Sequence, residues 1–198
     1  MLIDYDGIYR IAQRVKREFA DRFPGSSIAD EYDSLCEMNK LKLEEMDTSF
    51  SVQEFKALYC YKQNRHVVVY NKKLRGRLRL IVILHELGHK LLHWKIVGAV
   101  GHADRNIFGM NSQLEIEANI FVVEMLLDDS EVMEKLTGSG LTFSQIAQQL
   151  QVPEEFLAFK CRSINHRHNI RINIPCNAHG NCLKKMDNDD YDEVTYHE

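Results

Sequence analysis

The sequence lacks a long hydrophobic run. Its longest uninterrupted apolar stretch is Leu80 to Leu84, far short of the about 20 residues that a membrane-spanning helix needs. Asp4 and Asp6 interrupt the apolar residues at the N-terminus, and no basic segment leads into an apolar one, so no secretory signal is predicted. These absences predict a cytoplasmic protein with no membrane partner.

The sequence also lacks the cysteine pattern of a disulfide framework and an excess of basic residues. The five cysteines, Cys36, Cys60, Cys161, Cys176 and Cys182, are odd in number and scattered, which agrees with a reducing compartment. The formal net charge is −4 and the isoelectric point is about 6.1, which argues against a generally nucleic-acid-binding surface. With 44% apolar and 27% charged residues, the composition is that of an ordinary globular protein.

The hydrophobic pattern predicts helices and one hairpin in the first two thirds of the chain. Apolar residues recur at helical spacing over 4–22, 28–42, 78–94 and 112–127. Residues 57–61 and 66–70 are rich in β-branched and aromatic residues and flank Gln63 and Asn64, which predicts a β-hairpin. The glycine-containing stretch 98–109 is expected to be a loop beside the site described next.

A separate helical unit is predicted for residues 129–162. Short helices are expected over 131–136 and 142–150, and a third begins at Pro153. The remaining tail, 163–198, contains a predicted strand at 170–174 and an acidic end.

The segment His85–His89 reads HELGH and lies within the apolar helix at 78–94. Two histidines four residues apart on a helix are about 40° apart around the axis and about 6 Å along it, so both imidazoles can reach one metal ion. Glu86 lies beside the metal rather than on it, where a general base must lie to take a proton from water. Gly88 leaves room for the close approach of another element.

A catalytic zinc takes three protein ligands, so the third must come from elsewhere in the chain. The helix at 112–127 offers Glu115 and Glu117, which point about 200° apart. Both border the apolar face of that helix, and periodicity alone does not decide between them.

Two motifs in this order resemble the ImmA/IrrE family of metallopeptidases. The first is the HELGH segment followed by Leu91, Leu92 and His93, and the second is Glu115 followed by Ala118, Asn119 and Phe121. The similarity spans residues 67–127, with a weaker extension to residue 162. Val122 replaces the family's alanine, and Asp128–Asp129 replaces its methionine and proline.

The resemblance implies an α+β fold. A zincin-like metallopeptidase domain at 1–128, with its active-site helix packed on a small sheet, would precede a helix-turn-helix-like appendage. The family pattern assigns His85, His89 and Glu115 as ligands of Zn²⁺, with Mn²⁺ as the alternative ion, and Glu86 as the catalytic residue. Asn119 and His93 would support the ligands.

The resemblance also suggests how a substrate binds. In zincins an edge strand beside the active-site helix commonly holds the peptide as an added strand, and the candidate is Val67, Val68, Val69 and Tyr70 or their hairpin partner. Tyr70, His93 and His102 remain open as the donor that stabilises the oxyanion.

Family members typically cleave helix-turn-helix repressors of mobile elements or stress regulons, so a repressor is the expected protein substrate. The alternative is a non-enzymatic regulator that uses the same fold to bind a repressor or DNA, and the intact Glu86 argues against it. Residues 141–157 resemble a helix-turn-helix. Glu154 and Glu155 occupy the start of its second helix, where phosphate contact would be needed, so a structural or repressor-docking role is favoured over DNA binding.

Cys176, His179 and Cys182 could form a second metal site. They lack the paired spacing of a structural zinc site, so a loop with reduced thiols is the favoured interpretation.

Overall fold

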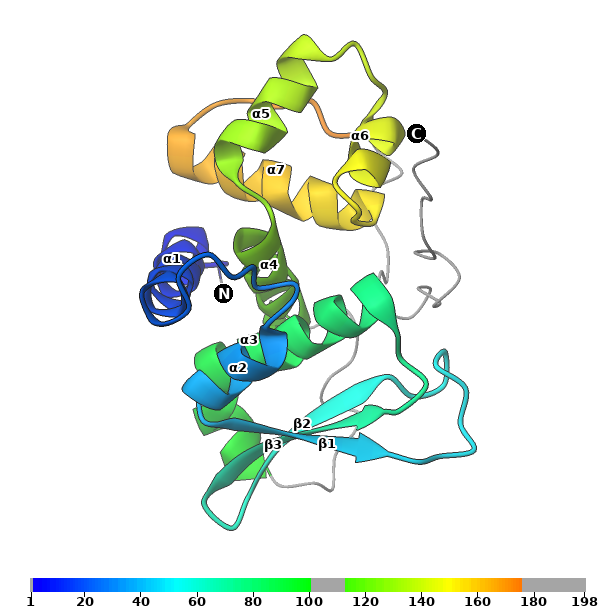
Figure 1. The fold of residues 1–198 in the computed structure, drawn as a ribbon. Helices are drawn as coiled ribbons and strands as arrows, with labels where there is room; N and C mark the ends of the chain where they lie inside the picture. The colour runs from blue at the N-terminus through cyan, green and yellow to red at the C-terminus, as the bar shows by residue number, and fades with distance from the viewer. Residues whose placement is uncertain (1, 101–112, 176–198) are drawn as a thin grey trace.

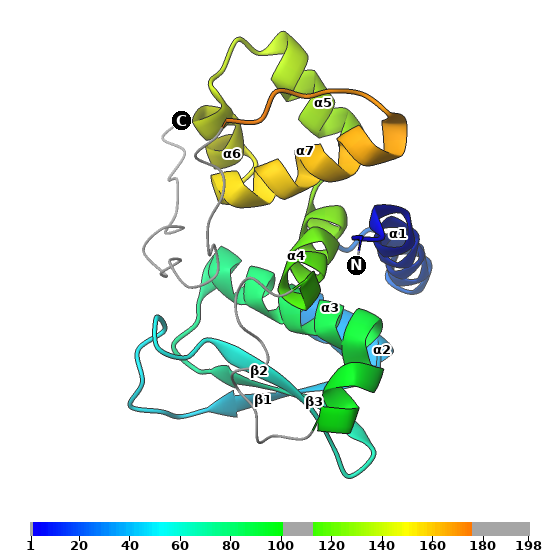
Figure 2. The ribbon, with the colours of Figure 1, turned by 180° about the vertical axis from the view of Figure 1, so that it is seen from behind.

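The computed structural model describes residues 2–100 and 113–175, with the backbone alone for 97–100. The fold is α+β. A three-stranded sheet lies at one end, and α3 (Gly76–Val100) crosses one face of it (Figures 1 and 2). α4 (Gln113–Leu126) packs on α3, and the opposite end is formed by α5 (Asp129–Gly138), α6 (Phe143–Gln149) and α7 (Glu154–His168). Within the described ranges, no helix combines the length and the hydrophobicity needed to cross a membrane.

The elements follow the predicted order in most of the chain. They are α1 (Tyr5–Arg22), α2 (Tyr32–Met38), β1 (Leu41–Met46), β2 (Ala57–Lys62), β3 (Arg65–Asn71), α3 (Gly76–Val100), α4 (Gln113–Leu126), α5 (Asp129–Gly138), α6 (Phe143–Gln149) and α7 (Glu154–His168). The helices predicted over 4–22 and 78–94 are confirmed, although α3 continues to Val100 through the start of the predicted loop. Thr142 caps α6 in a reciprocal capping box with Gln145.

Two predictions about secondary structure are wrong. The helix predicted over 28–42 is limited to α2, and Leu41–Met46 forms β1, whose parallel pairing with β3 is a long-range contact that local spacing does not show. Residues 170–174 form no strand. Instead the backbone N–H of Ile172 donates to the Asn165 side chain at 2.8 Å, which ties the segment to α7.

The sheet has the order β1-β3-β2, so β3 is its central strand. β3 pairs in parallel with β1 and antiparallel with β2. The predicted hairpin is confirmed: Gln63 and Asn64 have φ angles of 52° and 58°, the left-handed conformation that tight hairpins use. Because both sides of β3 are paired, the prediction that Val67–Tyr70 offers an open edge to a peptide is wrong. Only the hairpin partner, β2, remains a candidate.

The helical unit packs on the rest of the molecule through a buried ionic cluster. The Lys160 ammonium lies 2.7 Å from carboxylates of Glu124 on α4 and of Asp129, and Arg167 contacts Asp129 at 2.7 Å. Lys160 and Glu124 are almost completely buried. The contacts fix α7 on α4, and the proposed division of the chain at residue 128 stays a prediction.

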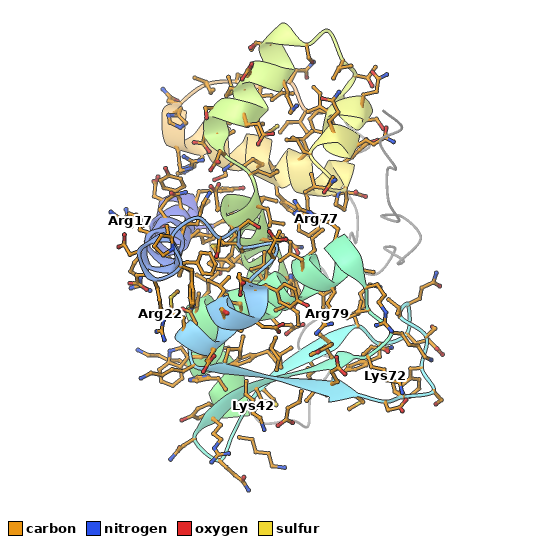
Figure 3. The ribbon with its side chains drawn as sticks, viewed as in Figure 1. Arg17, Arg22, Lys42, Lys72, Arg77 and Arg79 are labelled. Carbon is orange, nitrogen blue, oxygen red and sulfur yellow. The ribbon has the colours of Figure 1, made fainter. Side chains whose placement is uncertain are left out.

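The position of α7 does not favour DNA reading. Phe156, Leu157 and Ala158 are fully buried near its start, where a recognition helix would present side chains to a groove. Basic side chains are also dispersed: Figure 3 shows Arg17 on α1, Lys42 on the sheet and Lys72 after β3 in separate parts of the molecule. The helix-turn-helix character of residues 141–157 stays a prediction.

Candidate metal centre

The HELGH segment lies in the most deeply buried part of α3. His85 is 4% exposed and His89 is 5% exposed, and the apolar residues on both sides of them form the core. Buried imidazoles require polar partners, because an unpaired polar group in the interior costs about 1–3 kcal/mol. The partners come from α4, which packs directly on this part of α3.

Gly88 allows the two helices to approach closely. A β-carbon at this position would lie 3.2 Å from Cδ1 of Phe121 and 3.4 Å from Cα of Ala118, both on α4. These distances are shorter than the 3.5–4.0 Å of ordinary carbon contacts, roughly the optimum for dispersion. The absence of a side chain at Gly88 therefore lets α4 bring Glu115, one turn before Ala118, toward the two histidines.

Three ligand-type atoms converge between α3 and α4. The Nε2 atoms of His85 and His89 are 3.0 Å apart, and the Glu115 carboxylate lies 3.3 Å from the first and 3.2 Å from the second. Donors held about 2.0–2.1 Å from one ion at tetrahedral angles are about 3.3 Å from one another. The group therefore has the spacing of a metal site with two nitrogen donors and one oxygen donor.

Hydrogen bonds at the other ring nitrogens orient the two imidazoles. Nδ1 of His85 is 2.9 Å from Oδ1 of Asn119, and Nδ1 of His89 is 3.1 Å from Nδ1 of His93. Nε2 of His93 is in turn 3.0 Å from the Glu117 carboxylate.

One assignment of protons satisfies all of these contacts. His85 donates to Asn119, His89 donates to His93, and His93 donates to Glu117. The lone pairs on Nε2 of His85 and His89 then remain available to a metal. Glu117 thus contacts His93, which lies one turn of α3 beyond His89, whereas Glu115 contacts His85 and His89. The sequence indicated Glu117 only as an alternative metal ligand. Its contact with His93 depends on how α4 packs on α3, so the sequence carried no signal for it.

The pKa shifts of the three groups come from burial and from their mutual contacts. Burial lowers the pKa of His85, but the hydrogen bond and the charge of Glu115 outweigh burial and raise it. Burial lowers the pKa of His89 to about 4, so its ring is neutral near pH 7. Burial alone would raise the pKa of Glu115, but the hydrogen bonds of His85 and His89 outweigh it and hold the pKa well below its usual range. A neutral imidazole and an ionised carboxylate are the forms that bind a cation.

Glu86 is placed differently from the three converging groups. Its carboxylate accepts a hydrogen bond of 2.7 Å from the backbone N–H of Tyr59 on β2. Burial raises the pKa of Glu86 to about 7, with the neighbouring His85 and the Tyr59 N–H opposing the rise. A carboxyl with a pKa near neutrality can both take up and release a proton.

A known protein family matches the region of the chain that contains this site. Residues 38–162 match the family model of the IrrE N-terminal-like domain of the M78 peptidases. The chain belongs to this family. The matched segment includes α3 and α4 and continues through the helical unit into α7.

A relative of the chain occurs in a bacteriophage. The chain is 33% identical over 107 residues to a protein of Bacillus phage phi105 called uncharacterized immunity region protein 2. The match covers 54% of this chain and 66% of the phage protein, so the chain spans just under two thirds of that relative.

The other site residues predicted for this family member are spread over the structure. The Tyr70 hydroxyl donates to Glu45 at 2.8 Å and lies 2.6 Å from Arg79, so it is engaged away from the histidines. His93 holds His89, as described above. His102 and the group of Cys176, His179 and Cys182 lie outside the described residues.

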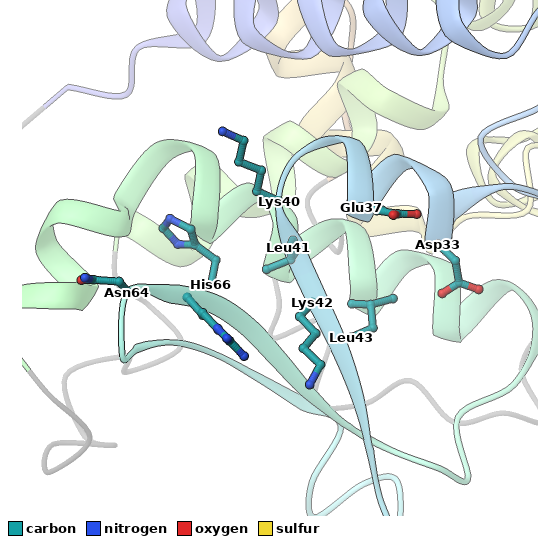
Figure 4. A pocket seen from close by; sticks show the side chains of 9 residues that line it. Asp33, Glu37, Lys40, Leu41, Lys42, Leu43, Asn64 and His66 are labelled. Carbon is teal, nitrogen blue, oxygen red and sulfur yellow. The ribbon is translucent and has the colours of Figure 1, made fainter.

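A groove of about 600 Å³ opens at the start of β1, beside the β2–β3 turn. Its lining includes the acidic residues Asp33 and Glu37 and the basic residues Lys40, Lys42 and Arg65. Lys40 and Lys42 project in opposite directions from the strand (Figure 4). None of the three converging metal-ligand groups lines this groove, which is therefore separate from the metal centre of the family fold.

Proposed function

We propose that this protein is a metal-dependent endopeptidase that holds Zn²⁺ with His85, His89 and Glu115 and uses Glu86 as its general base. The observation that carries the proposal is the convergence of three ligand atoms at 3.0–3.3 Å. Next to them lies a buried carboxyl that is not one of the three. Two histidines, one carboxylate and an open position are the ligand set of a catalytic rather than a structural zinc.

The metal, when bound, would polarise the scissile carbonyl and acidify water. Glu86 takes the proton from the attacking water and delivers it to the leaving amine. The Tyr59 N–H keeps the Glu86 carboxylate oriented during this transfer, and Asn119 and His93 keep the imidazoles in the required tautomers. The Mn²⁺ ion is the alternative occupant of the same ligands.

The edge of β2 is our candidate for peptide binding. The backbone N–H of Asn71 donates to the carbonyl of Lys56 at 2.8 Å, so residues 56, 58, 60 and 62 direct their peptide groups toward β3. Residues 57, 59 and 61 therefore direct theirs outward, as the bond from Tyr59 to Glu86 illustrates. Among the described residues no strand pairs with that side of β2. Because Glu86 takes the Tyr59 N–H, an extended peptide added beside Glu86 would pair with the Tyr59 carbonyl and the peptide groups of Tyr61.

The proposed substrate is a helix-turn-helix repressor, cleaved by a protein that acts as an anti-repressor in the cytoplasm. The support is the family of the chain and the name of its phage relative, which refers to an immunity region. Glu154 and Glu155 in the first turn of α7 favour a protein partner over direct contact with DNA.

The test compares the parent protein with Glu86→Gln, each loaded with zinc. The substrates are a helix-turn-helix repressor and denatured casein. Glutamine is nearly isosteric, so the variant should keep its metal and its fold while cleavage falls about 10²–10⁴-fold. Metal content and circular dichroism are measured on the same samples.

Equal cleavage rates would remove Glu86 from the mechanism. If neither protein cleaves either substrate, yet both bind the repressor tightly, the second hypothesis is favoured, in which the fold serves a non-enzymatic regulator.

A further inference from the structure

An aromatic cluster lies where α3 passes the end of β2. It consists of Tyr61, His66 and Trp94, which we call the Trp94 cluster. The ring centroids of Tyr61 and His66 are 4.8 Å apart, and the Trp94 ring lies 6.1 Å from each of them. Trp94 is 41% exposed, so a large part of its surface is open to a further apolar group.

The Trp94 cluster continues the proposed peptide-binding edge. Tyr61 follows Tyr59 by two strand positions, or about 6.8 Å, and its peptide groups face the same outward side. Trp94 follows Glu86 by eight helical positions, or about 12 Å. α3 and β2 lie side by side, so both elements lead from the catalytic carboxyl to the cluster.

A hydrogen bond and a lowered pKa define the state of the His66 ring. The Tyr59 hydroxyl and Nδ1 of His66 are 2.7 Å apart, which fixes the imidazole against the sheet. Burial and the nearby Lys90 lower the pKa of His66, so its ring is neutral near pH 7. Lys95 lies over the Trp94 ring at 5.9 Å, on a flexible and exposed side chain that can move aside.

We propose that the Trp94 cluster is a specificity pocket that receives an aromatic or large aliphatic side chain of the bound peptide, about two to four residues from the scissile bond. The inference rests on the proposed function, since it assumes a peptide extended along β2. A flat aromatic surface open on one side fits such a side chain, because apolar burial and ring stacking both favour it.

Trp94 is the only tryptophan of the chain, so its fluorescence reports on this pocket directly. The probes are short acetylated alanine–lysine peptides that carry one phenylalanine at successive positions, or none. They are titrated into zinc-loaded Glu86→Gln protein, which binds but does not cut. We expect the best phenylalanine peptide to bind at least about tenfold tighter than the peptide without phenylalanine, and to change the Trp94 emission.

Variants of the cluster and of a neighbouring residue complete the test. Tyr61→Ala should abolish the preference for phenylalanine. Ile96→Ala should keep it, because Ile96 is exposed on the same helix and takes no part in the cluster. In parallel, zinc-loaded parent protein and Trp94→Ala digest denatured casein, and mass spectrometry identifies the cut sites. The parent should favour large apolar residues at one position near the cut, and Trp94→Ala should lose that preference.

The outcomes separate the two proposals. If casein is cut with the same preference by parent and Trp94→Ala, or if all peptides bind Glu86→Gln equally, the specificity pocket is refuted and the endopeptidase stands. If nothing is cut but phenylalanine peptides still bind through Trp94, the endopeptidase fails and the pocket stands.

Discussion

The two glutamates of α4 offer the sharpest test of the proposed metal centre. In Glu115→Gln a charged donor within 3.3 Å of both Nε2 atoms is replaced by a neutral amide, so one of three ligands is lost. In Glu117→Gln the three donors stay, and only the hydrogen bond to His93 at 3.0 Å is weakened. Replacing groups that orient a ligand typically lowers metal affinity about 10–100-fold. We therefore expect this range for Glu117→Gln and a larger loss for Glu115→Gln.

The measurement is zinc affinity by competition with a chromophoric chelator, with circular dichroism to show that each variant is folded. His93→Gln is a useful companion to Glu117→Gln, since both interrupt the same series of hydrogen bonds and their effects should not add. If Glu117→Gln lost more zinc than Glu115→Gln, the assignment of the third ligand would be reversed while the peptidase proposal stood. Unchanged affinity in both variants would refute the metal centre.

Three further predictions concern stability. Gly88→Ala should lower the free energy of unfolding by about 1–3 kcal/mol through the contact with Phe121, offset by about 1 kcal/mol of gained helix propensity. Urea unfolding measures the change, and a wild-type midpoint would show that α4 shifts without cost. Lys160→Met should cost about 3–5 kcal/mol, because it leaves Glu124 buried beside a more distant Arg167; an unchanged midpoint would contradict a tightly coupled cluster. Removing zinc with a chelator should lower the melting temperature, because zinc at a thousandfold excess over its Kd stabilises the folded state by about 4 kcal/mol. Calorimetry measures the shift, and an unchanged melting temperature would mean that no metal binds the folded state.

The family and the core of the site were predictable because their information is local. Two histidines four positions apart on one helix face the same way whatever surrounds them, and an apolar helix around them excludes water. The hairpin through Gln63 and Asn64 is also set by local sequence, and it is present as predicted.

The tertiary structure decided what depends on contacts between distant segments. β1 was not predicted, and its first two residues were assigned to a helix. Its partner β3 lies about 25 positions away, and only that pairing reveals the strand. The same pairing makes β3 central, which closes the edge expected at Val67–Tyr70.

The sequence by itself determined that His85, Glu86 and His89 share one buried helix, since helical geometry fixes their relative positions. Only the packing of α4 on Gly88 decided which glutamate meets which histidine: Glu115 faces the Nε2 atoms and Glu117 reaches His93. Likewise, only the sheet brings the Tyr59 N–H to Glu86. Spacing along one helix is set by the backbone, whereas the rotation of one helix against another is set by the side chains between them.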